Sequence, residues 1–270
     1  MSDIRDFQED RVTEKEFQEQ YSRIKEMLLY GNIAKEEKCA ILLGGQPGSG
    51  KSSLFARMPD QDKYVVINGD DFRQYHPRFK EIVKTDLEHY AERTAAFSAR
   101  VSETLIEDLS AQGYNMIIEG TLRDPEVPIK TCTDLKERGY SAELLVMACD
   151  AEKAWESTLT RADELIKAKQ VGRLVPIDVY NYTVNHLPEN LETIDAAGCF
   201  DRITIVNREH EVLYPNRENI PLRDVLEKEL SLSAWNKNLE NHEKDFLERK
   251  VAILQKQINE REKSTRDRAD

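Results

Sequence analysis

Short apolar runs, separated by amphipathic segments, recur along most of the chain. Five of them have the length and continuous hydrophobicity of strands buried on both faces: 39–43, 64–67, 115–118, 143–148 and 203–206. Between them, segments such as 97–109 and 129–138 carry apolar residues at helical spacing. Strands that alternate with helices predict an α/β fold with a doubly wound, mostly parallel sheet flanked by helices. In such a sheet the loops that follow the strands meet at the carboxyl edge, where ligands bind.

The two ends of the chain have a helical pattern. Near the N-terminus, Thr13 and Glu16 form a capping-box pattern, and the apolar residues that follow lie on one helical face: Phe17, Tyr21, Ile24 and Leu28. We therefore expect an amphipathic helix over 13–30, laid on the main domain. Residues 208–214 indicate a short hairpin arm. Near the C-terminus, apolar residues recur at three- and four-residue steps between charged ones: Leu232, Trp235, Leu239, Leu247, Val251, Leu254 and Ile258. This spacing predicts a long amphipathic helix or a short coiled-coil segment.

These patterns divide the chain into three parts. We expect an N-terminal helical segment packed on the core over 1–36, a central α/β domain over 37–230, and a charged amphipathic C-terminal helix over 231–270. The four cysteines are far apart and have no metal-binding spacing, which favours free thiols in a reducing compartment.

Charge and hydropathy narrow the choice of partners. Acidic residues outnumber basic ones by 51 to 39, so the net charge is −12. Such a chain is a poor general binder of nucleic acid or of an anionic membrane, although a local basic cleft can still hold phosphate. No apolar run approaches the ~20 residues of a membrane span, and the first residues lack the apolar core of a signal peptide. We therefore expect a cytoplasmic protein that has neither a membrane nor a nucleic acid as its partner.

The strongest chemical signal is the segment Gly45-Gln46-Pro47-Gly48-Ser49-Gly50-Lys51-Ser52, which matches the phosphate-loop pattern G-x-x-x-x-G-K-[ST]. It follows the apolar run 39–43 directly and precedes residues compatible with a helix. Backbone N–H groups of such a loop surround phosphate oxygens, Lys51 lies between the β- and γ-phosphates, and the Ser52 hydroxyl is placed to ligate Mg²⁺. The segment therefore predicts binding of a nucleoside triphosphate.

Acidic residues follow the next two predicted strands. Asp70 and Asp71 come after 64–67, and Glu119 comes after 115–118. A kinase of small molecules needs a carboxylate that orients the acceptor hydroxyl, and Asp70 is the first candidate. Asp71 can instead face Mg²⁺, and both aspartates can cap a helix N-terminus. Glu119 can contact Mg²⁺ through water, bind an acceptor hydroxyl or form a salt bridge at the rim.

Two arginines are candidates for a lid over the triphosphate. Arg161 lies in a helical stretch and Arg173 follows Gly172. Kinases close a helical lid whose arginines neutralise the charge of the transferred group. On spacing alone, solvated surface ion pairs are the favoured interpretation of these arginines.

Longer strings around these residues resemble the zeta toxins of bacterial epsilon/zeta-type toxin–antitoxin systems, a group that includes the PezT-like toxins. The most specific are Asp70-Asp71-Phe72-Arg73-Gln74-Tyr75-His76-Pro77 and Ile118-Glu119-Gly120-Thr121. The phosphate loop, Val127-Pro128, Asn185-His186-Leu187-Pro188 and Asn190-Leu191-Glu192-Thr193 extend the resemblance. The resemblance as a whole extends from roughly residue 40 to 215, about two-thirds of the chain.

The resemblance implies a UDP-N-acetylglucosamine kinase of the P-loop fold with a helical lid. Such a kinase uses Mg²⁺ to transfer the γ-phosphate of ATP or GTP to the 3′-hydroxyl of the amino sugar, or acts on a related UDP-sugar, and blocks the use of a cell-wall precursor. It implies that Asp70 is the catalytic aspartate, Lys51 the loop lysine, and Arg161 and Arg173 the lid arginines. Five more residues match positions that line the sugar-nucleotide pocket: Glu103, Glu119, Thr121, Arg123 and Thr131. Family toxins are silenced by a small helical antitoxin, so the resemblance also implies such a partner.

The sequence departs from the family pattern at several points. Asp71 stands where the family often has an uncharged Thr or Ser, Leu122 replaces a Gly seen in some members, and the segment between Arg161 and Arg173 is a residue shorter. Two other functions therefore stay open: a P-loop kinase of another small molecule or a nucleic-acid end, and a regulatory nucleotide-binding module. The C-terminal helix can be a stabilising or dimerising helix, or a regulatory arm.

Overall fold

The computed structural model describes residues 10–31, 34, 36–57, 63–168, 170–172, 174–215 and 219–266, without the side chains of 257 and 260–266. Contacts within the chain divide it into two compact units. The first unit contains Met1–Lys38 and Asp62–Glu119, and the second contains Cys39–Gln61 and Gly120–Asp270. Each unit is described by itself.

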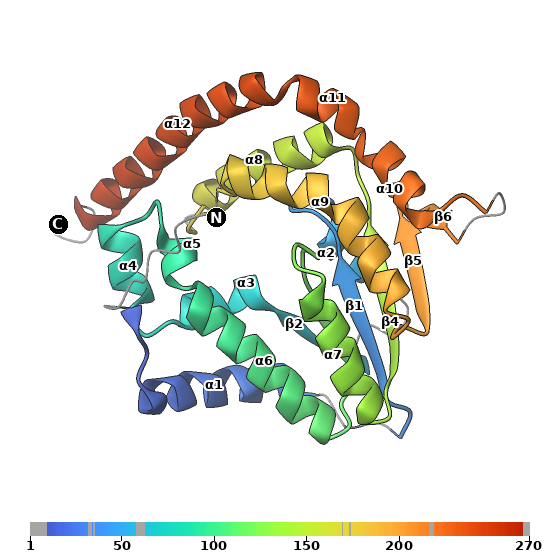
Figure 1. The fold of residues 1–270 in the computed structure, drawn as a ribbon. Helices are drawn as coiled ribbons and strands as arrows, with labels where there is room; N and C mark the ends of the chain where they lie inside the picture. Colours follow the sequence, from blue (N-terminus) through green and yellow to red (C-terminus); the bar gives the residue numbers. More distant parts are fainter. Residues whose placement is uncertain are drawn as a thin grey trace. The chain divides into compact units, whose positions relative to one another are not determined.

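A pair of parallel strands with helices around it forms the first unit (Figure 1). Strands β2 (Val65–Asn68) and β3 (Met116–Glu119) pair from Val65 opposite Met116 to Asn68 opposite Glu119. The long helix α6 (Ala95–Ala111) connects the end of the first strand to the start of the second and packs on β2. The other helices of this unit are α1 (Glu14–Leu29), α3 (Gly69–Phe72), the 3₁₀ turn η3 (Arg73–Tyr75), α4 (Phe79–Thr85) and α5 (Tyr90–Arg93).

Helix α1 confirms the amphipathic helix predicted near the N-terminus. The Glu16 amide donates to the Thr13 hydroxyl over 3.3 Å, and the Thr13 amide donates back to the Glu16 carboxylate over 2.8 Å. This capping box satisfies amide groups that the first turn of a helix leaves without partners. Phe17, Tyr21 and Ile24 are buried, and Phe17 meets Phe97 of α6 edge to face.

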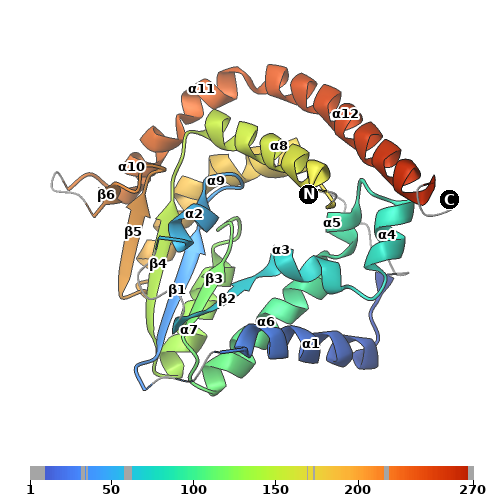
Figure 2. The same ribbon diagram turned by 180° about the vertical axis from the view of Figure 1, so that it is seen from behind.

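Four strands in the order β1-β4-β5-β6 form the sheet of the second unit (Figure 2). Strands β1 (Cys39–Gly44), β4 (Ser141–Met147) and β5 (Arg202–Val206) are parallel, and the short β6 (Val212–Tyr214) returns antiparallel to β5. This return confirms the hairpin arm predicted over 208–214. The helices are α2 (Lys51–Phe55), α7 (Glu126–Glu137), α8 (Ala151–Lys167), α9 (Ile177–Ala196), α10 (Leu222–Leu230), α11 (Leu232–Lys237) and α12 (Leu239–Arg266). Parallel strands joined through helices in both units confirm the predicted α/β class with a mostly parallel sheet.

An aromatic cluster anchors the C-terminal helices of the second unit. The Trp155 ring of α8 lies 5.0 Å from Tyr180 of α9, 6.3 Å from Trp235 of α11 and 5.5 Å from Phe246 of α12, measured between ring centroids. All four side chains are buried. Because aromatic side chains bury large apolar areas, this cluster fixes α11 and α12 along α8 (Figure 1).

The buried face of α12 differs from the sequence prediction. The spacing favoured Leu247, Val251, Leu254 and Ile258 as the apolar face, but Leu247 and Val251 are 60% and 69% exposed. The helix packs instead through Phe246 and Ile253. Arg249, which lies between Phe246 and Ile253, forms an ion pair with Glu156 of α8. Lys256, which follows Ile253, forms an ion pair with Asp163 of the same helix. The crossing with α8, and not the longest apolar stripe, therefore decides which face of α12 is buried.

Among the described residues, none of the helices combines the length and the apolar character that crossing a membrane requires.

We expect Trp235→Ala to lower the free energy of unfolding by about 3–5 kcal/mol, because it removes a buried ring from the aromatic cluster and leaves a cavity. Urea denaturation followed by circular dichroism measures this loss. The exposed Val251→Ala on the same helical arm is the control, with an expected change within about 0.5 kcal/mol. A loss below about 1 kcal/mol for Trp235→Ala would show that the cluster does not anchor the arm.

Candidate active site

The phosphate loop of the second unit lies in close contact with β4 and α8. Gly45 has a φ of +135° and Gly48 a φ of +75°, backbone conformations that side-chain-bearing residues rarely adopt. A Cβ atom added at Gly45 would lie 2.4 Å from the Met147 carbonyl oxygen, and one at Gly48 would lie 2.0 Å from the Ala154 carbonyl oxygen. Only glycine fits at these two positions, because the opposing atoms belong to the backbone and cannot rotate away.

The loop lysine is buried within the loop to which it belongs. Lys51 is 7% exposed, and its Nζ donates to the carbonyl oxygens of Gly45 and Gln46 over 2.9 Å and 3.1 Å. Gln46 is fully buried, and its Nε2 donates to the carbonyl of Cys149, which follows β4. Two carbonyls of the loop therefore hold the ammonium group in place.

The residues present fit a triphosphate with Mg²⁺. The Ser49 Oγ is buried and has no hydrogen-bond partner among the described residues, so the loop contains a polar group that remains to be satisfied. Ser52 is exposed on the first turn of α2. In the described part of the chain, no three His, Cys, Asp or Glu side chains are grouped as metal ligands. A hydroxyl plus phosphate oxygens is a donor set that Mg²⁺ accepts, since it keeps few protein ligands.

Asp70 of the first unit lies on α3, directly after β2. The helix is capped by Asn68, whose side-chain oxygen accepts from the Asp70 amide over 3.1 Å, so neither aspartate is the N-cap. The Asp70 carboxylate accepts from Arg73 Nε over 3.0 Å and is 40% exposed. The Arg73 guanidinium also donates to the Ala91 carbonyl and to the Thr94 hydroxyl. Arg73, for which the sequence analysis gave no role, therefore orients the predicted catalytic carboxylate.

Glu119 is the last residue of β3, and Glu103 lies on α6. Glu119 is opposite Asn68 in the parallel register, and Asn68 caps the helix that carries Asp70. A Cβ added at Gly69 would lie 3.3 Å from Ser102 Oγ of α6, so this helix passes beside the start of α3. Glu103 follows Ser102 and is exposed. The first unit therefore places Asp70 and Glu119 at the carboxyl ends of its strands, and Glu103 on the surface of α6.

His76, from the most specific string of the resemblance, has a structural position. It is 3% exposed, and its Nδ1 accepts from the Arg78 amide over 3.2 Å while its Nε2 lies 3.1 Å from the Asp10 carbonyl oxygen. This arrangement fits the neutral ring with a proton on Nε2. Burial lowers the pKa of His76, which keeps the ring in this neutral form.

The loop after β3 presents Thr121 and Arg123 on the surface of the second unit. Leu122 between them has a φ of 56° and is buried, and a Cβ added at Gly44 would lie 2.3 Å from its Cδ1. The side chain of Asn190 on α9 donates to the carbonyls of Leu122 and Arg123 over 3.0 Å and 2.9 Å. Asn190, which the sequence gave only as part of a resembling string without a role, is a positioning residue, and it holds the loop in a shape that exposes the two predicted residues.

The remaining predicted site residues are Thr131, Arg161 and Arg173. Thr131 is half-buried on α7, and its hydroxyl donates to the Val127 carbonyl of its own helix over 2.8 Å. Arg161 is exposed on α8. Arg173 lies outside the described residues, so the predicted lid stays a prediction.

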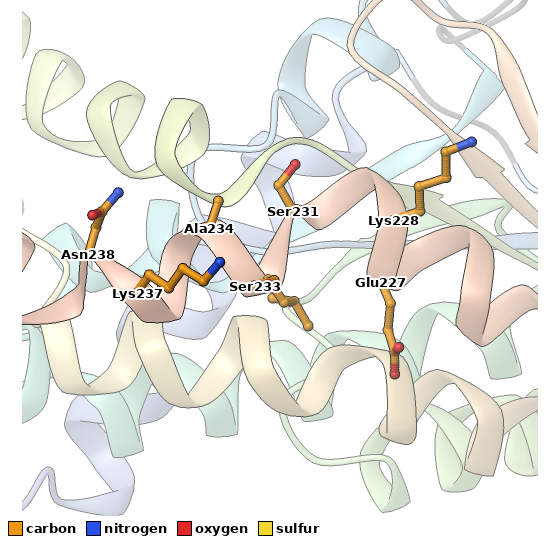
Figure 3. A pocket seen from close by; sticks show the side chains of 8 residues that line it. Glu227, Lys228, Ser231, Ser233, Ala234, Lys237 and Asn238 are labelled. Carbon is orange, nitrogen blue, oxygen red and sulfur yellow. The ribbon is translucent and has the colours of Figure 1, made fainter.

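A surface pocket lies over α10 and α11, and none of the site residues predicted from the sequence lines it (Figure 3). It has a volume of about 540 Å³ and is lined by Glu227, Lys228, Ser231, Leu232, Ser233, Ala234, Lys237 and Asn238. Its lining contains none of the buried unpartnered polar side chains found in the described residues, so it is not a second candidate site.

Parallel strands alternating with helices, with the phosphate loop between β1 and α2, define a P-loop α/β protein. The model of the zeta toxin family matches residues 14–219. The chain is 37% identical over 233 residues to toxin zeta of Streptococcus pyogenes, covering 84% of this chain and 81% of that protein. It is 34% identical over 252 residues to toxin PezT of Streptococcus pneumoniae, covering 92% and 96%. The chain belongs to the zeta toxin family, which confirms the resemblance found in the sequence.

Solved structures agree with this assignment. A structure from the PezAT chromosomal toxin–antitoxin system of S. pneumoniae matches with a TM-score of 0.72 and 31% identity, over 88% of this chain and 98% of that chain. A structure of the AvrRxo1-ORF1:AvrRxo1-ORF2 complex matches with a TM-score of 0.54 at 13% identity, over 73% and 66%, and shares the fold alone.

We expect Gly48→Ala to weaken triphosphate binding by about tenfold or more, which corresponds to about 1.4 kcal/mol. The added methyl group would overlap the Ala154 carbonyl, so the loop must move away from α8. Isothermal titration with Mg²⁺-ATP measures the affinity. Gly139→Ala is the matched control, because Gly139 also has a positive φ, +81°, but has no atom within 4 Å of an added Cβ. Equal affinity in the two variants would disprove the steric argument.

Proposed function

We propose that this protein is a kinase that transfers the γ-phosphate of ATP or GTP to the 3′-hydroxyl of the amino sugar of UDP-N-acetylglucosamine, or of a related UDP-sugar. The observation that carries the proposal is a buried lysine within a phosphate loop, in a chain that belongs to the zeta toxin family. The acceptor itself comes from the family resemblance of the residues around Asp70 and Glu119.

On the donor side, the loop amides and Lys51 bind the β- and γ-phosphates, and the Ser52 hydroxyl holds the Mg²⁺ that the nucleotide carries. The bound ion supplies positive charge against the phosphate oxygens. Lys51 exchanges one of its carbonyl partners for phosphate oxygens when the nucleotide binds. Arg161 and Arg173 are proposed to neutralise charge on the transferred group.

On the acceptor side, Asp70 orients the sugar hydroxyl and takes its proton as the hydroxyl oxygen attacks the γ-phosphorus. The bond between that phosphorus and the bridging oxygen breaks, and the nucleoside diphosphate leaves. Arg73 keeps the carboxylate in one orientation through its bond to Asp70 Oδ1. Glu103, Glu119, Thr121, Arg123 and Thr131 are proposed to bind the UDP-sugar.

The proposed product would withhold a precursor from peptidoglycan synthesis, which accounts for toxicity. Such a substrate is cytoplasmic, and we infer the same location for the protein. The PezAT structure comes from a toxin–antitoxin system, and its likeness to this chain supports a small helical antitoxin as the partner.

We expect the wild-type protein to add one phosphate to at least one sugar nucleotide in a mixture of UDP-N-acetylglucosamine, UDP-N-acetylgalactosamine and UDP-glucose. The reaction contains Mg²⁺-ATP and is read by mass spectrometry. Asp70→Asn should abolish the mass gain because the amide cannot take the proton, while the affinity for ATP changes by less than about twofold. The variant Asp71→Asn is the matched control, because it changes the neighbouring carboxylate and leaves Asp70 in place. We expect this variant to keep most of the turnover.

Two results would contradict the proposal. Full turnover by Asp70→Asn would remove the role given to this carboxylate. No phosphate gain on any sugar nucleotide, in a folded protein that binds ATP, would mean that the acceptor belongs to another class of molecule.

We expect Arg73→Gln to lower kcat about tenfold or more with little change in the KM for ATP, because Asp70 loses the donor that orients it. The exposed Arg23→Gln in the same unit removes the same charge and should leave kcat within about twofold. Steady-state kinetics on the best acceptor decide the question. A wild-type kcat in Arg73→Gln would show that Asp70 does not depend on the bond to Arg73.

A further inference from the structure

A second arginine, Arg208, contacts the phosphate loop from outside the loop motif. It lies in the turn between β5 and β6, which the buried side chain of Asn207 holds together. The Glu211 amide donates to Asn207 Oδ1 over 2.9 Å, and the Asn207 amide donates to the Glu211 carbonyl over 3.1 Å. The His210 amide closes the turn on the Asn207 carbonyl over 3.0 Å. The backbone of Arg208 is therefore fixed before its side chain makes any contact.

The guanidinium group of Arg208 bonds to two successive carbonyls of the loop. Its Nε donates to the Ser49 carbonyl over 3.2 Å, and one terminal nitrogen donates to the Gly48 carbonyl. The same terminal nitrogen donates to Ser157 Oγ of α8 over 2.7 Å. A guanidinium provides several donors in one rigid plane, so a single side chain holds both the loop and the helix.

These bonds determine where the loop amides point. In a trans peptide group the C=O and the N–H are directed to opposite sides. The carbonyls of Gly48 and Ser49 are directed toward Arg208, so the N–H groups of Ser49 and Gly50 are directed away from it. The Ser49 N–H donates to the Gln46 carbonyl over 3.2 Å and closes the turn of the loop, whereas the Gly50 N–H is placed for a ligand. Phosphate loops bind their ligand through such N–H groups. The two carbonyl dipoles are also satisfied by a cation, which reduces their repulsion of phosphate.

The contact with Ser157 extends this arrangement to α8. Ser157 lies four residues before Arg161, one helical turn away on the same helix. Gly48 packs on Ala154 of this helix, as described above. Arg208 therefore connects the turn after β5, the phosphate loop and the helix that carries the proposed lid arginine.

We propose that Arg208 is a positioning residue for the triphosphate, which acts by orienting the backbone amides of the phosphate loop and not by touching the nucleotide. This proposal rests on one part of the proposed function, the binding of a triphosphate by the loop. It does not depend on the identity of the acceptor. No sequence motif points to this residue, because a side chain that bonds to backbone carbonyls leaves no pattern in the loop it supports.

Two variants separate the geometry of the side chain from its charge. Arg208→Gln removes the cation and the fork, whereas Arg208→Lys keeps the cation but cannot bond to the two loop carbonyls and Ser157 together. We expect Arg208→Gln to weaken binding by about tenfold or more and Arg208→Lys by about fivefold or more. Isothermal titration uses two probes, Mg²⁺-ATP and inorganic Mg²⁺-tripolyphosphate, and the loss should be the same for both.

The control is Arg202→Gln on strand β5. Arg202 is exposed and pairs with Glu143, and its removal should leave the affinity for both probes within about twofold. Arg208→Gln at wild-type affinity, or Arg208→Lys at wild-type affinity, would overturn the proposal, the latter because charge alone would then suffice. A loss for ATP with none for tripolyphosphate would also overturn it, because the side chain would then contact the nucleoside.

Circular dichroism and urea denaturation accompany each titration. If Arg208→Gln does not fold, Arg208→Lys alone decides the outcome, since it retains the charge and most of the side-chain volume. Both probes measure binding without an acceptor, so a failure to phosphorylate any UDP-sugar would not alter the result for Arg208.

Discussion

The close packing of the phosphate loop against two backbone carbonyls is the constraint on which the second unit depends. The loop passes so near Met147 at the end of β4 and Ala154 on α8 that no side chain fits at Gly45 or Gly48. A loop of glycines would otherwise be free to adopt many conformations, because glycine has the largest backbone freedom of all residues. The packing removes that freedom, and the loop can then present its amide groups without further ordering when a ligand binds.

This constraint holds only while α8 stays in place, which gives the C-terminal helices a physical role. Trp155 follows Ala154 on α8 and lies at the centre of the cluster that Trp235 and Phe246 complete. The apolar contacts of α11 and α12 therefore support the carbonyl against which Gly48 packs. Of the roles left open for the C-terminal segment, stabilisation follows directly from these contacts, and it makes the arm part of the framework of the loop.

Local signals predicted the strands, the phosphate loop and the capped N-terminal helix, because each depends on neighbouring residues. The position of Asp70 also followed from a local rule, since a carboxylate after a parallel strand lies at its carboxyl end. The roles of Asn190 and Arg208 could not be predicted, because their partners are mostly backbone carbonyls distant in the sequence. Arg73 lies only three residues after Asp70, but its contacts with Ala91 and Thr94, which fix the guanidinium, are distant in the sequence. The buried face of α12 was predicted wrongly for a related reason. Helical periodicity identifies a stripe of apolar residues, but only the tertiary packing decides that Phe246 and Ile253 meet α8.

The chain has a net charge of −12, so a site for phosphate requires cations that acidic neighbours do not neutralise. Several surface cations of this protein are paired with carboxylates, for example Arg202 with Glu143 and Arg249 with Glu156. At the phosphate loop, by contrast, Arg208 donates to the backbone carbonyls of Gly48 and Ser49. A carbonyl orients a cation as well as a carboxylate does, but it has no net charge and leaves the positive field intact. An acidic protein can therefore keep a local site for a triphosphate, because neutral groups hold a cation beside the loop.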